Sequence, residues 1–213
     1  MKDLDIIIRG FLYKENWSPL SRYRGKLNYT INFLNVKSFY LNLLKELSKK
    51  YSISLYFSTY DTTPSNISET LLKEFSQYNT RFLFSPESKS TQFTTTIKSL
   101  KYLSTNGNNK LLIRGDLIIK KELIELLKNS KFNKNVKVLF KSQDLVNDTT
   151  HLIPYSKVNS MIEFFKKNKF HAHNLHNHVD VEPLLNPSFK AHTYNVPQYY
   201  EIYDSTTCKN IIK

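Results

Sequence analysis

A chain of 213 residues, 40% hydrophobic and 14% aromatic, is long enough to bury a core, and this composition excludes an intrinsically disordered protein. Lysine and arginine (31) outnumber aspartate and glutamate (18), which gives a formal net charge of +13 at pH 7. Such an excess favours a polyanion, an anionic membrane surface or a phosphorylated small molecule as partner, and a solvated basic face is the simpler alternative. The basic residues are scattered, without the long basic run that forms a nucleic-acid-binding tail.

The cysteine content and the first apolar segment predict a soluble, cytoplasmic protein. Cys208 is the single cysteine, which excludes an internal disulfide and a cysteine-based zinc site and favours a reducing compartment. The first apolar run, Ile6–Ile8, is far too short for the core of a signal peptide or for a membrane span.

Taken in chain order, the hydrophobic pattern predicts alternating strands and helices. Ile6–Ile8, followed by Arg9 and Gly10, is typical of a buried strand that ends in a glycine turn. The patterns predict further strands at residues 53–60, 81–84, 111–113 and 136–140, and helices at about 36–49, 66–78, 90–103, 121–128 and 155–167. Beyond residue 169 the pattern dissolves, with Tyr199 and Tyr200 as a possible late strand or docking site. We predict one α/β domain over residues 1–213, with a mostly parallel central sheet flanked by helices.

Polar residues stand at the ends of several predicted strands. They are Arg9 and Gly10, Asp61 and Thr62, Arg114 and Asp116, and Asn147 and Asp148. Because open α/β sheets bind ligands at the carboxyl ends of their strands, we expect the charges at 114 and 116 to lie within reach of a phosphate or a metal ion. An ion pair between Arg114 and Asp116 that only tethers a loop is the alternative.

The usual glycine fingerprints are absent from the chain. It has four glycines, and none lies in a G-x-G-x-x-G or P-loop arrangement. The G-x-S-x-G nucleophile elbow is also missing. These observations argue against a dinucleotide-binding Rossmann enzyme, a Walker ATPase and an α/β-hydrolase.

Five segments in order resemble the landmarks of glycosyltransferases with a GT-A-like fold, of the polysaccharide and viral-glycan type. The segments are Ile6–Gly10, Leu55–Asp61, Gln92–Ile97, Ile113–Ile118 and Val146–Pro154. The likeness extends from about residue 6 to residue 200, and it rests on the order and spacing of the segments. It implies transfer of a sugar from a nucleoside diphosphate donor, with Mn²⁺ or Mg²⁺ bridging the diphosphate to an acidic motif.

This resemblance implies a donor site around the predicted strand ends. Asp116 would be the metal-side carboxylate, and Arg114 beside it would hold a phosphate and stabilise the leaving diphosphate. The common pattern of two carboxylates, Asp-x-Asp, is here Arg-x-Asp. Arg9 would lie near the base or a phosphate, and Gly10 would let the backbone approach the nucleotide, although a simple turn is the alternative.

Three further residues complete the expected donor site. Asp61 and Thr62, one strand over, could hydrogen-bond uracil or ribose, or else belong to a turn that leads into a helix. The resemblance places Gln92, at the start of a helix, near the donor; an amide there is otherwise solvated.

Two residues nearer the C-terminus are expected to serve the acceptor and the metal. Asp148 is our candidate for orienting the acceptor hydroxyl or acting as general base, and its alternative role is a helix cap. The stretch His171–His178 contains four histidines, and the resemblance makes His176 a candidate additional metal ligand. A polar surface loop is the alternative for this stretch.

Together these observations predict a nucleotide-sugar glycosyltransferase that depends on Mn²⁺ or Mg²⁺. We expect a uridine diphosphate sugar as donor and a glycan or glycoprotein as acceptor, with peripheral membrane contact allowed by the basic surface. The nucleotide-binding half would span about residues 1–118 and the acceptor half about residues 119–213. The alternative is a non-catalytic, basic nucleic-acid-binding module. A phosphotransferase or nuclease would need more carboxylates at the strand ends than the chain offers.

Overall fold

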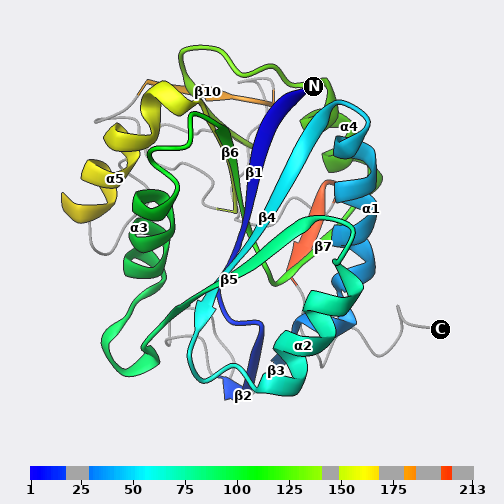
Figure 1. The fold of residues 1–213 in the computed structure, drawn as a ribbon. Helices are drawn as coiled ribbons and strands as arrows, with labels where there is room; N and C mark the ends of the chain where they lie inside the picture. Colours follow the sequence, from blue (N-terminus) through cyan, green and yellow to red (C-terminus); the bar gives the residue numbers. More distant parts are fainter. Residues whose placement is uncertain (18–28, 141–148, 168–179, 186–197, 203–213) are drawn as a thin grey trace.

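The computed structural model describes residues 1–17, 29–140, 149–167, 180–185 and 198–202. A seven-stranded sheet with the spatial order β10-β8-β9-β6-β1-β4-β5 forms its centre (Figure 1). These strands are β1 (Lys2–Arg9), β4 (Tyr51–Tyr60), β5 (Asn79–Ser85), β6 (Asn109–Arg114), β8 (Val136–Val138), β9 (Thr150–Ile153) and β10 (Val181–Pro183). All are parallel except β9, which runs antiparallel to its neighbours β6 and β8. The mostly parallel sheet predicted from the sequence is confirmed.

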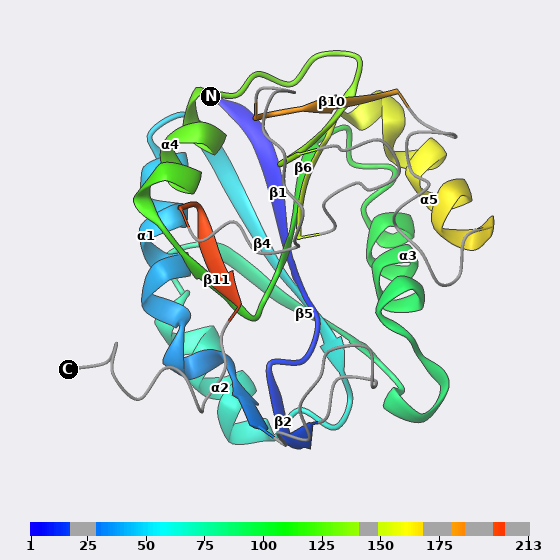
Figure 2. The same cartoon turned by 180° about the vertical axis from the view of Figure 1, so that it is seen from behind.

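Helices cover both faces of this sheet. They are α1 (Lys37–Ser48), α2 (Ser65–Glu74), α3 (Gln92–Tyr102), α4 (Lys121–Asn129) and α5 (Val158–Lys167). Helices α1, α2 and α4 lie on one side of the sheet, and α3 and α5 lie on the other (Figures 1 and 2). The five predicted helices are therefore all present, with ends that differ from the expected ones by a few residues. Within the described ranges, no helix combines the length and the hydrophobicity needed to cross a bilayer.

The central strand β1 is buried on both faces, which explains its continuous hydrophobic run. Leu4, Ile6 and Ile8 belong to the core beneath α1, α2 and α4, whereas Ile7 belongs to the core beneath α3 and α5. Alternate residues of a strand point to opposite faces, so β1 contributes to both cores at once. Burial continues to the end of the strand and includes Arg9.

Two small antiparallel pairs accompany the main sheet. The strands β2 (Tyr13–Trp17) and β3 (Tyr29–Asn32) form one pair, and β7 (Leu117–Ile119) and β11 (Tyr200–Ile202) form the other. The sequence pattern did not predict β2, β3, β7, β9 or β10. Tyr200 lies in β11 and is fully buried, which agrees with the late strand considered for this region.

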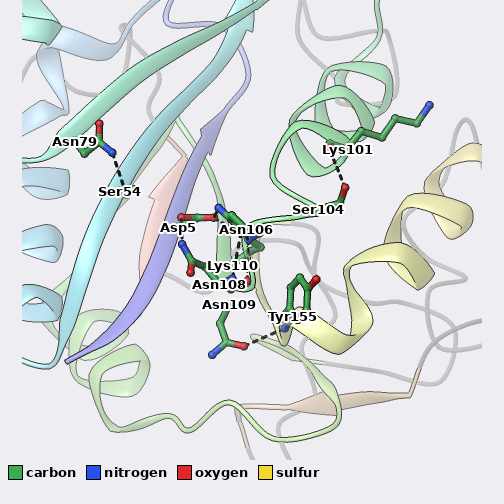
Figure 3. A network of polar contacts seen from close by, with 10 residues as sticks. All are labelled: Asp5, Ser54, Asn79, Lys101, Ser104, Asn106, Asn108, Asn109, Lys110 and Tyr155. Carbon is green, nitrogen blue, oxygen red and sulfur yellow. Dashed lines mark hydrogen bonds and ion pairs between the residues drawn. The ribbon is translucent and has the colours of Figure 1, made fainter.

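A buried ion pair joins the first halves of β1 and β6, on the side of α3 and α5 (Figure 3). Asp5 and Lys110 are register partners with fully buried side chains, and Lys110 Nζ lies 2.7 Å from Asp5 Oδ2. Asn106 Nδ2 and Asn108 Nδ2 also donate to the Asp5 carboxylate, at 2.7 and 3.0 Å. Lys110 Nζ further donates to Asn106 Oδ1 (2.6 Å) and to the Asn108 carbonyl (2.8 Å). Burial lowers the pKa of the Lys110 ammonium, and Asp5 opposes this shift.

Candidate functional site

The direction in which the chain winds across the sheet reverses at β1, so the carboxyl ends of β1 and β6 form a topological switch point. From β1 the chain crosses through α1 to β4 on one side, whereas from β5 it returns through α3 to β6 on the other side. Helices α1 and α3 lie on opposite faces, so the connections at these strand ends diverge (Figure 1). In open α/β sheets such a switch point is where ligands bind.

Arg9 and Arg114 end these two strands side by side. They are register partners in the parallel pair of β1 and β6, so their Cα atoms are about 4.8 Å apart. Both leave the sheet on the side of α3 and α5, because Ile7 and Leu112, two residues earlier on each strand, belong to the core on that side. Arg9 is 4% exposed, and the Arg114 side chain is 22% exposed. The sequence analysis expected a donor site around the ends of the predicted strands, and the sheet places these two ends at one edge.

Two glycines allow the backbone to turn at this edge. Gly10 has φ +113°, which disfavours residues with a side chain, and its N–H donates to the Ser58 carbonyl of β4 at 3.0 Å. The Gly115 N–H donates to the Arg9 carbonyl at 2.9 Å. A Cβ at Gly115 would lie 3.3 Å from Ile8 Cγ2 and 3.6 Å from the Arg9 oxygen, so a glycine fits this close approach best.

Arg114 and Asp116 form a two-pronged ion pair. Arg114 Nε donates to Asp116 Oδ1 at 2.9 Å, and Nη2 donates to Oδ2 at 2.5 Å. Both carboxylate oxygens of Asp116 are therefore engaged by one guanidinium, in the bidentate geometry that makes arginine–carboxylate pairs strong. The sequence left two alternatives for Arg114 and Asp116: a ligand site, or an ion pair that tethers the loop. The ion pair is present in the structure.

Tyr40 of α1 holds the loop that carries this pair. Its buried hydroxyl donates to the Arg114 carbonyl and accepts a hydrogen bond from the Leu117 N–H at 3.2 Å. Burial, assisted by the Asp116 carboxylate, raises the pKa of the Tyr40 phenol well above its ordinary value. Tyr40 therefore stays a hydrogen-bond donor at neutral pH. Tyr40 lies in the helix that the sequence predicts at about residues 36–49, and a tyrosine on a fully buried helix face usually has a polar partner.

The Tyr40→Phe variant is expected to lose about 1–3 kcal/mol of unfolding free energy, because it leaves buried backbone groups of residues 114 and 117 without their partner. Urea unfolding measures this loss. The exposed Tyr155 provides the control, and Tyr155→Phe is expected to leave stability unchanged. Equal stabilities of Tyr40→Phe and the wild type would contradict the assigned role.

Asp61 and Thr62 lie at the same edge of the sheet, one strand beyond β1, and contact Glu87. Both are exposed; Asp61 Oδ1 accepts from the Glu87 N–H at 3.0 Å, and the Thr62 hydroxyl donates to the Glu87 carboxylate. Lys14 also binds Glu87, and the hydrogen bonds from Lys14 and Thr62 lower the pKa of the Glu87 carboxyl. Contacts to a nucleotide remain a prediction for Asp61 and Thr62.

An aromatic pair beside these residues was not identified from the sequence. Phe11, directly after Gly10, stacks on Tyr60 at the end of β4, with ring centroids 4.3 Å apart and planes inclined by 28°. The positive charge of Arg9 acts on the Tyr60 phenol and opposes the rise in its pKa that burial causes. The pair therefore forms part of the surroundings of Arg9.

Gln92 is the first residue of α3, whose N-terminus lies at this edge of the sheet. Its carbonyl accepts hydrogen bonds from the hydroxyls of Thr95 and Thr96, both at 2.8 Å. Ser58, the register partner of Arg9 on β4, donates to the Thr95 carbonyl at 3.3 Å and thereby ties this helix to the sheet. A contact between Gln92 and the donor remains a prediction.

Two of the expected site residues, Asp148 and His176, lie outside the described residues. The neighbour of Asp148, Thr149, is described, and its carbonyl accepts a hydrogen bond from the Arg114 N–H at 3.0 Å. The chain therefore enters β9 beside Arg114. The roles expected from the sequence, Asp148 as a general base and His176 as a metal ligand, therefore remain predictions.

The described residues at the ends of β1 and β6 do not form a ready-made set of ligands for a divalent cation. In the part of the chain that the structure describes, no three His, Cys, Asp or Glu residues are grouped as metal ligands. Asp116 directs both oxygens at Arg114, as given above. A cation such as Mg²⁺ prefers six oxygen ligands, and it would have to share the Asp116 carboxylate with the positively charged Arg114.

Comparison with known proteins identifies the fold. No protein-family model matches the chain, and neither does any curated protein sequence. Among solved structures, the galactosyltransferase LgtC in complex with donor and acceptor sugar analogs aligns with a TM-score of 0.51 and 11% identity, over 83% of this chain and 72% of LgtC. An active-site mutant of LgtC gives 0.51 and 10%, over 83% and 71% of the two chains. The 4-diphosphocytidyl-2C-methyl-D-erythritol synthase of Anaerococcus prevotii gives 0.48 and 13%, over 90% and 93%. The likeness to LgtC shows that this chain has a GT-A-like, Rossmann-type α/β fold, as predicted from its sequence.

Proposed function

We propose that the protein is a glycosyltransferase that takes a sugar from a nucleoside diphosphate donor and transfers it to a glycan or glycoprotein acceptor. The observation that carries this proposal is the position of Arg9 and Arg114, which are register partners at the switch point of the sheet, each close to a glycine turn. A uridine diphosphate sugar is the proposed donor. The fold of LgtC, which has been solved with donor and acceptor sugar analogs, supports this class of reaction.

The chemistry of the reaction suits these residues. Departure of a nucleoside diphosphate builds negative charge on its β-phosphate, and a fixed guanidinium stabilises that charge as the bond to the sugar breaks. Arginine binds phosphate through two parallel hydrogen bonds, which also orient the leaving group. Asp148 is the proposed base for the acceptor hydroxyl, in the acceptor half of the chain from about residue 119.

A panel of nucleoside diphosphates tests the donor site by thermal shift. UDP, GDP, CDP, ADP and dTDP are each added to the protein, and the corresponding nucleosides serve as controls without phosphate. We expect UDP to raise the melting temperature most, because it is the diphosphate of the proposed donor. A ligand present at 100 times its Kd adds about 2.7 kcal/mol to the unfolding free energy, which is readily measured. If none of the diphosphates raises the melting temperature, the donor site is wrong.

A second thermal-shift panel, of DNA and RNA oligonucleotides, tests the nucleic-acid-binding alternative. A basic module that binds several phosphates would be stabilised by DNA or RNA oligonucleotides, and its affinity would fall steeply with salt concentration. We expect oligonucleotides to shift melting less than UDP does. Release of UDP from a panel of UDP-sugars, with and without added glycans, then identifies the sugar and measures transfer.

A further inference from the structure

We propose that the diphosphate is held by the guanidinium groups of Arg9 and Arg114, and that its binding requires no divalent cation. This inference rests on the proposed function and specifies how the same site recognises its ligand. It departs from the Mn²⁺ or Mg²⁺ dependence expected from the resemblance.

The first support is the charge at the switch point. Arg9 and Arg114 contribute two positive charges from neighbouring strands, and Asp116 contributes one negative charge. An Asp-x-Asp motif in place of Arg114-Gly115-Asp116 would differ here by two charge units, which is the charge that a divalent cation brings. With arginine instead of aspartate at position 114, the protein itself supplies the additional positive charge that a metal ion would otherwise bring.

The second support is the geometry of Asp116. Its two oxygens accept from Arg114 Nε and Nη2, so a cation at this carboxylate would compete with the guanidinium for the same negative charge. Displacement of the guanidinium would leave a mobile positive charge beside the bound metal, and the two would repel each other. The ion pair is also fixed from the backbone, because Tyr40 holds both the Arg114 carbonyl and the Leu117 N–H.

The third support is the position of Arg9. Its side chain is 4% exposed and stands beside a second arginine on the next strand, on the same side of the sheet. Two guanidinium groups on neighbouring strands make the potential at this edge more positive, which favours the binding of a doubly charged anion there. A diphosphate supplies such charge together with acceptor oxygens for both guanidinium groups.

Calorimetric titration of UDP in two buffers tests the inference on the wild-type protein. One buffer contains EDTA, and the other contains Mn²⁺ in its place. We expect the two Kd values to agree within a factor of about 3, which is below 1 kcal/mol. Binding that appears only with Mn²⁺, or that tightens at least tenfold with it, would overturn the inference and leave the proposed function standing. Failure of UDP to bind in either buffer would overturn both.

A charge-reversal variant adds a second, independent readout. Arg114→Asp is expected to weaken UDP binding in EDTA at least about tenfold, because it removes a charged hydrogen-bond donor and adds a repelling carboxylate. Arg81→Asp, at an exposed position of β5, makes the same change of charge and is expected to keep the affinity within about threefold. Equal UDP affinities of Arg114→Asp and Arg81→Asp would overturn the inference, and circular dichroism checks that both variants are folded.

Discussion

Replacing Arg114 with methionine is expected to weaken the binding of UDP by about ten- to one-hundredfold. A hydrogen bond to a charged group contributes about 1.5–3 kcal/mol, which corresponds to this range of affinity. Methionine preserves much of the volume and flexibility of the arginine stem while it removes the guanidinium, so the change acts mainly on charge and hydrogen bonding. Titration calorimetry measures the effect directly.

The controls for Arg114→Met separate binding from folding. Arg81→Met makes the same substitution at an exposed position of β5, and its UDP affinity is expected to equal that of the wild type. Arg114→Met also removes the partner of Asp116, so the unfolding free energy is measured alongside the affinity. Unchanged UDP affinity in a folded Arg114→Met protein would show that residue 114 does not contact the diphosphate.

Replacing Asp5 with alanine is expected to lower the unfolding free energy by about 3–5 kcal/mol, the largest loss of stability that we predict. The substitution leaves the fully buried Lys110 ammonium without its counter-ion and removes the acceptor for Asn106 and Asn108. Such a loss is a large fraction of the stability of a typical domain. Urea unfolding, followed by circular dichroism, measures it.

Two further variants make the Asp5 result specific to the buried pair. Asp3→Ala, at an exposed position of the same strand, is expected to leave stability nearly unchanged. The double variant Asp5→Leu with Lys110→Met replaces the pair by apolar groups and is expected to be more stable than Asp5→Ala alone. A double variant less stable than Asp5→Ala would contradict this explanation of the loss.

The central strands and the helices could be predicted because each is encoded by the hydrophobic pattern of a short, continuous segment. Ile6–Ile8 and Leu111–Ile113 are uninterrupted apolar runs, which is typical of strands buried on both faces. Since parallel strands end at one edge of a sheet, the polar residues after these runs were expected to lie near one another. Arg9 and Arg114 are indeed register partners on neighbouring strands. The helical periodicity was equally local and gave the helix positions to within a few residues.

The missed features depend on contacts between distant parts of the chain. The strand β9 is only four residues long, and it joins the sheet by pairing with β6, about 40 residues earlier. The pairing of Asp5 with Lys110 and the contact of Tyr40 with Arg114 likewise connect residues far apart in sequence. Neither pattern nor propensity reports such pairings. The ion pair of Arg114 with Asp116 was one of two alternatives that the sequence left open, and only the side-chain geometry distinguishes them.

A crystal structure of the protein with UDP, grown in EDTA, tests the central claim most directly. We predict that the diphosphate lies at the carboxyl ends of β1 and β6, with phosphate oxygens within hydrogen-bonding distance of the Arg9 and Arg114 guanidinium groups. A diphosphate bound elsewhere on the molecule, with Arg9 and Arg114 making no contact to it, would contradict the account.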